Sequence, residues 1–505
     1  MLLDRRHFLA LSSTIALATV AGCQSGPARA LPDPDDWQQL KASFSGQLLF
    51  PSDAGFSRFY KAANSRYDSI TPAVIARCAN TSDVQQILAF ARKFQLPITG
   101  RSGGHNYAGY SSTKGILLDL ALMADIQHEA EDDTAWIGAG AKLGDIYDQL
   151  SKKGRSIPGG SCVGVGIAGL TLGGGFGIAD RLYGLTCDAL LEAEVVTVDG
   201  EVLRCNEQQN ADLFWGLRGG GGGQFGIVTR LKFQTFATAD ILSCHAYFAL
   251  KDALPVLNLW QHWSHQLPEA LWSQAALWWR GEPDHEPQLQ IRVTSLGQIK
   301  LLQQQWVNWL RRLPVQPVEQ DVVLHNYREY MLTDCAGLEM PECKLPHQSE
   351  QAKLKRVAMA GSSDFFNQVI SRAGLEALLG QVQQRQQQGL SGGILLTLMG
   401  GAISSVPADH TAFAHRDALF SAQYLVSRPV GADEKLMQGA ALWVNHMRTV
   451  MKPYSTGGAY LNYTDALIKN WSEAYYGRHY EKLQQLKGRY DPEQLLRFAQ
   501  GIKPA

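Results

Sequence analysis

The pattern of hydrophobic and polar positions between residues 70 and 238 alternates between two kinds of element. Short apolar runs bounded by turn residues predict buried strands, and apolar positions at i, i+3 and i+4 predict helices. Glycine-rich stretches separate these elements and predict loops. We therefore expect strands at residues 73–78, 115–120, 135–140, 191–198 and 227–233. We expect one helix that is capped by residues 81–83 and a second helix over residues 143–153.

The pattern changes between residues 239 and 455, where the runs are longer and eight of the twelve tryptophans lie. We expect an antiparallel sheet with helices on one face, which would form a substrate-binding domain. The strand-like runs are 270–279, 288–294, 393–399 and 418–425, and the helix-like runs are 251–266, 297–312 and 434–450.

The chain has 505 residues, enough for two or three domains. Charged residues make up 18% and hydrophobic residues 45%, which indicates a globular rather than a disordered protein. The formal net charge is −1 and the sequence has no basic stripe, which excludes a nucleic-acid-binding protein. We divide the chain into an N-terminal signal (1–30), a first domain (31–238), a second domain (239–455) and a C-terminal segment (456–505).

Residues 1–30 are predicted to be an export signal and not part of the fold. Residues 4–9 resemble the twin-arginine motif, and an apolar stretch too short to span a membrane follows them. Residues 20–23 resemble a lipobox, in which Cys23 would be lipidated and would tether the protein to a membrane. Cleavage after Ala30 is the alternative. We expect export by the twin-arginine route to the periplasm or the cell surface.

Seven cysteines follow Cys23, and their spacing indicates no dense disulfide framework. Cys335 and Cys343 could pair in an oxidising compartment, but the sequence leaves this pairing open. It also leaves the oligomeric state open.

Two glycine-rich loops each present one nucleophilic side chain. His105 lies in the loop of residues 100–107, and Cys162 lies in the loop of residues 158–166. Glycine on both sides removes side-chain bulk and allows positive φ, so a ligand can lie against the backbone. An imidazole and a thiolate can each bond to an electrophile such as a flavin, at its 8α-methyl group or at C6. No second histidine or cysteine stands at ligand spacing near either residue, so we expect no metal site.

A further glycine run, residues 219–223, is flanked by aromatic and aliphatic residues rather than by the polar residues of a linker. Neither this run nor the one at residues 173–177 has the placement of the G-x-G-x-x-G dinucleotide motif, which argues against a Rossmann fold. A buried glycine strip can hold a pyrophosphate through its backbone N–H groups.

Together these features resemble a known family. Residues 70–238 resemble the PCMH-type (vanillyl-alcohol-oxidase-like) FAD-binding domain, and the two nucleophile loops resemble the bicovalent FAD-attachment loops of the berberine-bridge-enzyme-like oxidases. Residues 459–465 resemble the Y-x-N-Y-x-D signature of that family, whereas Gln224 and Leu170 depart from the asparagine and histidine found in many members. The resemblance implies an α+β protein, with a PCMH-type FAD-binding domain and an antiparallel-sheet substrate domain that has helices on one face.

The resemblance also implies the cofactor and the residues that hold it. FAD would be attached covalently, with its 8α-methyl group on His105 and its C6 on Cys162. The remaining cofactor-binding positions that it implies are Arg101, Ser102, Gly103, Gly104, Asn106, Ser161, Val165, Gly166, Gly169, Gly173, Gly177, Gly226, Val228 and Asn462.

The catalytic residues implied by the resemblance are Tyr463, Tyr460, Gln423 and Tyr107. Tyr463 is the expected base, and because an ordinary phenol has a pKa of about 10, we expect its environment to lower that value. Tyr460 would face away from Tyr463 in a strand, so joint action requires irregular backbone between them. Tyr107 and Gln423 are expected to line the substrate side.

The function implied is that of an exported FAD-dependent oxidoreductase. It would oxidise a small-molecule alcohol, such as a sugar hydroxyl to a lactone, by proton abstraction and hydride transfer to FAD. Dioxygen is the expected acceptor, because Val165 would leave space near the reactive carbon of the flavin. The alternatives are a dehydrogenase that uses a quinone or cytochrome, and a flavin-retaining binding protein without turnover.

Overall fold

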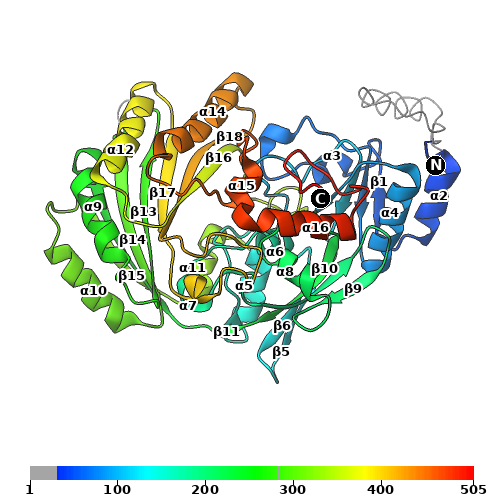
Figure 1. The fold of residues 1–505 in the computed structure, drawn as a ribbon, viewed down its shortest axis with the longest axis horizontal. Helices are drawn as coiled ribbons and strands as arrows, with labels where there is room; N and C mark the ends of the chain where they lie inside the picture. Colours follow the sequence, from blue (N-terminus) through cyan, green and yellow to red (C-terminus); the bar gives the residue numbers. More distant parts are fainter. Residues whose placement is uncertain (1–30, 283–284) are drawn as a thin grey trace.

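The computed structural model describes residues 31–282 and 285–505, and Figure 1 labels its elements. The predicted signal, with its twin-arginine motif and Cys23, lies outside the described residues. Two domains lie side by side, and the C-terminal helices lie between them (Figure 1). Within the described part of the chain, no helix is both long and apolar enough to cross a membrane.

The first domain is built on two main sheets. The four-stranded sheet has the order β1 (Gln47–Leu49), β2 (Val74–Arg77), β4 (Ile116–Asp119) and β3 (Ile98–Arg101). It is mixed, because β1 is antiparallel to β2 whereas the other two pairs are parallel. The five-stranded sheet is antiparallel, and its order is β5 (Ile126–Glu129), β6 (Thr134–Gly138), β10 (Ile227–Gln234), β8 (Leu190–Val196) and β9 (Val202–Cys205).

Helices and short elements complete the first domain. The longest helix, α4 (Thr81–Phe94), is capped by Asn80, whose side chain accepts a hydrogen bond from the Asp83 N–H; the expected cap at residues 81–83 is therefore one position too late. The other elements are α2 (Pro34–Ser43), α3 (Phe56–Phe59), η2 (Ser65–Tyr67), α5 (Leu143–Ser151), β7 (Arg155–Ser156), α6 (Ile167–Leu172), α7 (Asp180–Tyr183), α8 (Ala211–Leu217) and β11 (Phe236–Ala237).

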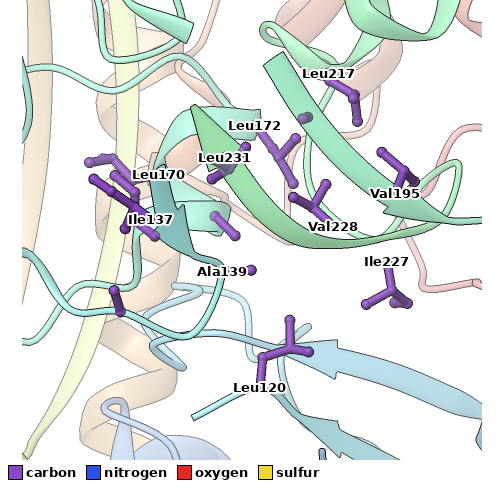
Figure 2. Close-up of a cluster of buried hydrophobic side chains, with 14 of the residues drawn as sticks. Leu120, Ile137, Ala139, Leu170, Leu172, Val195, Leu217, Ile227, Val228 and Leu231 are labelled. Carbon is purple, nitrogen blue, oxygen red and sulfur yellow. The ribbon is translucent and has the colours of Figure 1, made fainter. Parts of the chain in front are cut away.

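The hydrophobic core of the first domain includes side chains from both of its main sheets (Figure 2). Leu120, directly after β4, lies on one side of this core, and Ile227 and Val228 of β10 lie on the other. These three side chains are buried, yet they also border the cavity described below. The core of the first domain therefore continues into the wall of that cavity.

The second domain is a seven-stranded antiparallel sheet with helices on one face, as the sequence predicts. Its order is β15 (Glu319–His325), β12 (Ile241–Ala249), β14 (Gln288–Leu296), β13 (Leu271–Trp279), β17 (Gly392–Leu398), β18 (Phe420–Pro429) and β16 (Val357–Phe366). The helices packed on its outer face are α9 (Ala253–Ser264), α10 (Ile299–Arg311), α12 (Arg372–Gln387) and α14 (Glu434–Met451).

The connection between β15 and β16 returns to the first domain. It contains α11 (Tyr327–Met331) and η4 (Thr333–Cys335), and a disulfide joins Cys335 to Cys343, the pairing that the sequence leaves open. The remaining short elements of this domain are η3 (Leu250–Asp252) and α13 (Ala402–Ser405).

The C-terminal segment packs against the first domain. It consists of η5 (Leu461–Tyr463), α15 (Trp471–Tyr476), η6 (Gly477–His479) and α16 (Tyr480–Tyr490). The ammonium group of Lys487 is fully buried and donates to Asp491 at 2.6 Å and to the Gln224 carbonyl at 2.7 Å. The Gln224 side chain in turn accepts from the Ile502 N–H at 3.0 Å. Gln224 therefore holds this segment in place through both its backbone and its side chain.

Candidate active site

A cavity of about 630 Å³ lies where the two domains and the C-terminal segment meet. The first domain contributes the loops around His105 and Cys162 and the glycine strip at residues 221–223. The second domain contributes the inner face of its sheet, and the C-terminal segment contributes residues 460–464 and 496–498. The size is that of a cofactor or ligand pocket, for which roughly 300–1,000 Å³ is usual.

The two nucleophile loops contact each other through their backbones. A Cβ atom added to Gly166 would lie 2.2 Å from the Gly103 nitrogen, and one added to Gly103 would lie 2.1 Å from the Gly166 nitrogen. Only glycine allows this approach, so the sequence pattern has a direct structural reason. The contact brings His105 and Cys162, far apart in sequence, to the same cavity.

The His105 ring is poised as a neutral nucleophile. Its Nε2 is buried and has no hydrogen-bond partner among the described residues. Burial, and then the nearby positive charge of Lys142, lower the pKa of His105 to about 4, so the ring is neutral at neutral pH. A neutral imidazole on a residue that lines a cavity is suited to bonding an electrophilic ligand.

The Cys162 side chain is exposed to the same cavity. Burial within the surrounding protein, and then the charge of Asp334, raise the pKa of the Cys162 thiol. In the protein alone, the surroundings of Cys162 therefore favour the thiol over the thiolate.

A third segment, which the sequence analysis missed, ties the two loops together. The Gln348 amide nitrogen donates to the Gly103 carbonyl at 3.2 Å and to the Gly164 carbonyl at 2.8 Å. The Nε2 atom of buried His347 also lies 3.1 Å from the Gly103 carbonyl. One side chain thus bridges the histidine loop and the cysteine loop.

Three of the four predicted catalytic residues meet at the substrate side of the cavity. The rings of Tyr107 and Tyr463 stack with their centroids 5.6 Å apart. The Gln423 amide on β18 donates to the Tyr107 hydroxyl at 2.8 Å. All three residues line the cavity and come from three different parts of the chain.

Tyr460 also borders the cavity, but its hydroxyl is already engaged. Its ring stacks on Phe176 at 3.9 Å between centroids, and its hydroxyl accepts from the Gly175 N–H and the Asn462 amide, each at 2.9 Å. The short helix η5 turns the backbone so that Tyr460 and Tyr463 contact edge to face at 4.9 Å, which is the irregular backbone that the sequence analysis requires. Tyr460 therefore holds the segment that presents Tyr463.

The pKa of Tyr463 is not lowered by its environment, contrary to the prediction from the sequence. Burial raises the pKa of Tyr463 above the usual value, and the neighbouring Cys162 and Asp180 raise it further. In the protein alone this phenol is therefore a weaker acid than free tyrosine.

The predicted cofactor-binding residues divide into those that face the cavity and those that shape its walls. The residues that line the cavity through their backbone or side chains are Gly103, Gly104, Ser161, Val165, Gly166, Gly169, Gly226, Val228 and Asn462. Arg101 borders the cavity, but its guanidinium is buried and donates to four backbone carbonyls. Ser102 donates to the Ala139 carbonyl at 2.6 Å, and Asn106 to the Thr464 hydroxyl at 3.3 Å.

Gly173 and Gly177 do not border the cavity, so the structure does not place them at a cofactor as predicted. A Cβ atom on Gly173 would meet the Asn462 side chain at 2.1 Å, and one on Gly177 would meet the Gly159 carbonyl oxygen at 1.7 Å. These glycines are required for close packing behind the cavity wall.

The residues present fit a flavin dinucleotide. No atom lies within 4 Å of a Cβ placed on Gly169 or Gly223, so these positions border open space against which a long ligand can lie. No Asp or Glu among the described residues lines the cavity, which suits a ligand with two phosphates. His105, whose ring is neutral at neutral pH, also lines this cavity.

Comparison with known proteins agrees with this fit. Residues 72–206 match the family described as FAD binding domain, and residues 459–503 match the family described as berberine and berberine like.

The chain therefore contains both of these domains, and the proteins to which it is similar are FAD-linked oxidoreductases and berberine-bridge-enzyme-like proteins. It is similar to an uncharacterized FAD-linked oxidoreductase, YgaK, of Bacillus subtilis (29% identical over 470 residues, covering 92% of this chain and 98% of that protein). It is also similar to the chitooligosaccharide oxidase of Gibberella zeae (28% identical over 492 residues, 91% and 93%). Among solved structures, BBE-like 1 from Physcomitrella patens superposes with a TM-score of 0.82 at 26% identity, covering 93% of this chain and 99% of that one.

These matches establish the coarse function. The protein is an FAD-linked oxidoreductase with a PCMH-type FAD-binding domain. The alternative of a binding protein without turnover is thereby set aside. The cavity lined by His105, Cys162 and Tyr463 is the candidate site for FAD and for the substrate.

Proposed function

We propose that this protein is an exported oxidase that converts an alcohol to a carbonyl compound, with a sugar hydroxyl oxidised to a lactone as the leading case. The observation that carries the proposal is the meeting of Tyr463, Tyr107 and Gln423 at the substrate side of a cavity that fits FAD. A chitooligosaccharide oxidase among the similar proteins supports a carbohydrate substrate.

Tyr463 is proposed to take the proton from the reacting hydroxyl. Its ring stacks on Tyr107, and Gln423 holds the Tyr107 hydroxyl, so the two phenols are fixed in orientation before substrate arrives. FAD, when bound, would accept the hydride from the carbon that carries the reacting hydroxyl. Because the pKa of Tyr463 is raised, the proton transfer has to occur together with the loss of the hydride, or has to be assisted by groups of the bound FAD or substrate.

We further propose that FAD is attached through both His105 and Cys162. The supporting observations are the unpartnered His105 nitrogen, the exposed Cys162 side chain and the backbone contact that holds both loops at one cavity. Dioxygen is proposed as the electron acceptor, with a quinone or cytochrome as the alternative.

Export by the twin-arginine route is proposed from residues 1–30, with either a lipidated Cys23 or cleavage after Ala30. The disulfide between Cys335 and Cys343 is consistent with an oxidising compartment, since such bonds rarely persist in the cytosol.

The deciding experiment is anaerobic mixing of the holoenzyme with a panel of sugars, aryl alcohols and polyketide glycosides. We expect at least one sugar to bleach the visible absorbance of the flavin, and air to restore it quickly. Bleaching by aryl alcohols alone would overturn the carbohydrate assignment. Slow recovery in air combined with fast recovery on adding a quinone would replace the oxidase by a dehydrogenase.

A further inference from the structure

The basic residues that border the cavity are not balanced by acidic ones. Arg101, Arg292, Lys355, Arg356 and Arg497 all line it, and no Asp or Glu of the described residues does. A cavity with this charge pattern favours ligands that carry negative charge. The phosphates of FAD would provide some of that negative charge, and a basic side chain that is not paired elsewhere would be available to the substrate.

Two of the arginines are satisfied by the protein itself. Arg101 donates to the backbone carbonyls of residues 59–61 and of Ser111. Arg356 pairs with Asp68. Lys355 and Arg497 are exposed, so water can hydrate their charges. Arg292 differs from these four residues, because it is partly buried and has no ion-pair partner among the described residues.

Arg292 stands on the inner face of the second-domain sheet, on β14. Its guanidinium carbon lies 4.8 Å from the centroid of the buried Trp272 ring. One of its terminal nitrogens donates to the Gln274 amide oxygen at 3.3 Å, and Gln274 donates to Thr397 at 2.9 Å. Neutral groups therefore fix the plane of the guanidinium without neutralising its charge.

Most of the donors of Arg292 are unused. Its Nε is buried and has no hydrogen-bond partner among the described residues, and none of its nitrogens forms an ion pair with a carboxylate there. Guanidinium offers five N–H donors in a fixed fork, and a buried donor without a partner is destabilising. The guanidinium of Arg292 therefore keeps donors available for an acceptor in the cavity that it lines.

The groups that face Arg292 from neighbouring strands do not supply that acceptor. His245 on the neighbouring strand β12 is paired with Arg292. Asp321 on β15 is paired with the other side of His245, so it lies about 10 Å from Arg292 by the usual strand spacing. Burial lowers the pKa of His245, which makes this ring neutral at neutral pH. On the other side stand Gln274 and Thr397, which are also neutral.

We propose that Arg292 binds a carboxylate of the substrate, so that the enzyme oxidises an acidic glycoside, such as an oligosaccharide that contains a uronic acid. This inference rests on the proposed alcohol oxidation and specifies its substrate class. A carboxylate is the natural acceptor for the terminal guanidinium nitrogens of Arg292, of which only one has a protein partner.

The sheet register gives the size of that substrate. Arg292 and Gln423 stand on strands β14 and β18, three strands apart, which is about 14 Å across the sheet. Gln423, with Tyr107 and Tyr463, marks the end where the hydroxyl reacts. The carboxylate is therefore held at the opposite end of a substrate larger than a small hydroxy acid.

The test uses uronic-acid disaccharides, each paired with its methyl ester, which keeps the shape and removes the charge. Binding to oxidised holoenzyme is measured by calorimetry, and anaerobic flavin bleaching is measured in parallel. We expect the wild type to bind at least one acid about 10- to 100-fold more tightly than its ester, the range for a charge-assisted hydrogen bond. Arg292→Gln should lose this preference, and Arg292→Lys should keep part of it.

Arg280→Gln is the matched control, because Arg280 is an exposed arginine just beyond β13 and its loss changes the net charge equally. This variant should keep the wild-type preference for acid over ester. If the wild type binds acids and esters equally, or if Arg292→Gln keeps the preference, the inference is wrong. If Arg292→Gln instead loses flavin while its substrate preference is unchanged, Arg292 serves the cofactor and the inference is also wrong.

The two measurements separate this inference from the proposed function. Acids that bind through Arg292 but never bleach the flavin would refute alcohol oxidation and leave the acid site standing. Neutral sugars that bleach the flavin as readily as acids would support the oxidation and refute the acid site.

Discussion

The rings of Tyr107 and Tyr463 stack at 5.6 Å between centroids, although one lies in the histidine loop of the first domain and the other belongs to the C-terminal segment. Each ring restricts the movement of the other, and Gln423 of the second domain fixes the Tyr107 hydroxyl. The substrate side of the cavity is therefore formed jointly by all three parts of the chain.

Replacing Tyr463 by phenylalanine removes the phenol and keeps the stacked ring. We expect flavin reduction by substrate to slow by about 10²- to 10⁴-fold, the usual contribution of a positioned base. Because its pKa is raised, Tyr463 is protonated at neutral pH, so wild-type reduction should become faster as pH rises and the variant should lose this dependence. Anaerobic stopped-flow measurements across pH check both points. Unchanged reduction would move the base elsewhere, with Tyr460 as the next candidate.

Covalent attachment can be tested by denaturation. Acid-precipitated wild-type protein should keep its yellow colour, and His105→Ala and Cys162→Ala should each keep one bond to the flavin. The double variant should release free FAD. Peptide masses after proteolysis locate each bond. Release of flavin from the denatured wild type would refute bicovalent attachment.

The bridge made by Gln348 should matter for the second bond. Gln348→Leu keeps the bulk but removes the hydrogen bonds to the Gly103 and Gly164 carbonyls. We expect the fraction of chains with both bonds to fall, since effective attachment depends on the spacing of the two loops. Gln351→Leu is the control, because that side chain is exposed and makes no hydrogen bond among the described residues. Equal bond counts in the two variants would show that the bridge is dispensable.

Val165 tests the choice of acceptor. It lines the cavity three residues after Cys162, and leucine at this position would add one methylene group to the wall. We expect Val165→Leu to slow re-oxidation by air while flavin reduction by substrate is unaffected. Stopped-flow mixing of the reduced enzyme with oxygen measures this directly. If both half-reactions change together, Val165 acts only through packing, and slow re-oxidation of the wild type would favour the dehydrogenase.

Asp180 should make stability depend on pH. Its side chain is buried, one carboxyl oxygen has no partner among the described residues, and burial raises the pKa of Asp180 from 3.8 to about 7. The folded state thus holds a proton that the unfolded state releases, so this contribution is fully present below pH 4 and is lost as pH rises through 7. Asp180→Asn should remove the dependence and stabilise the protein at pH 8 by at most about 4 kcal/mol. Denaturant unfolding at pH 5 and pH 8 provides the measurement, and an equal stability change at both values would contradict the expectation.

Most strands could be predicted because their burial makes short, almost continuous apolar runs. The four residues of β2 and of β4 are all buried, and both strands were predicted within two residues of their ends. The strand β16 was missed because its inner face carries small residues, including Gly361, over which the Tyr107 ring lies. The helix α12 was also missed, although its buried leucines at positions 375, 378 and 379 have helical spacing.

The parts of the site that lie in contiguous motifs were accessible from sequence. His105, Cys162 and Tyr463 each stand in a local pattern that predicts a special backbone or a specific chemistry. Arg292 and Gln348 have no such pattern, because their surroundings are made by segments far away in the chain. The pKa of Tyr463 was misjudged for the same reason, since it depends on burial by distant elements.

One wall of the cavity is formed by residues 496–498, and Gln224 holds this region through the Ile502 N–H. A ribosome that has made the chain only as far as residue 455 has already produced the sheets of both domains and both nucleophile loops, but not this wall. A flavin that arrives at that stage finds an open groove and can leave again. Secure retention of the cofactor therefore follows the synthesis of both domains, and a truncated chain should be recognisable by its lack of colour before any loss of its sheets.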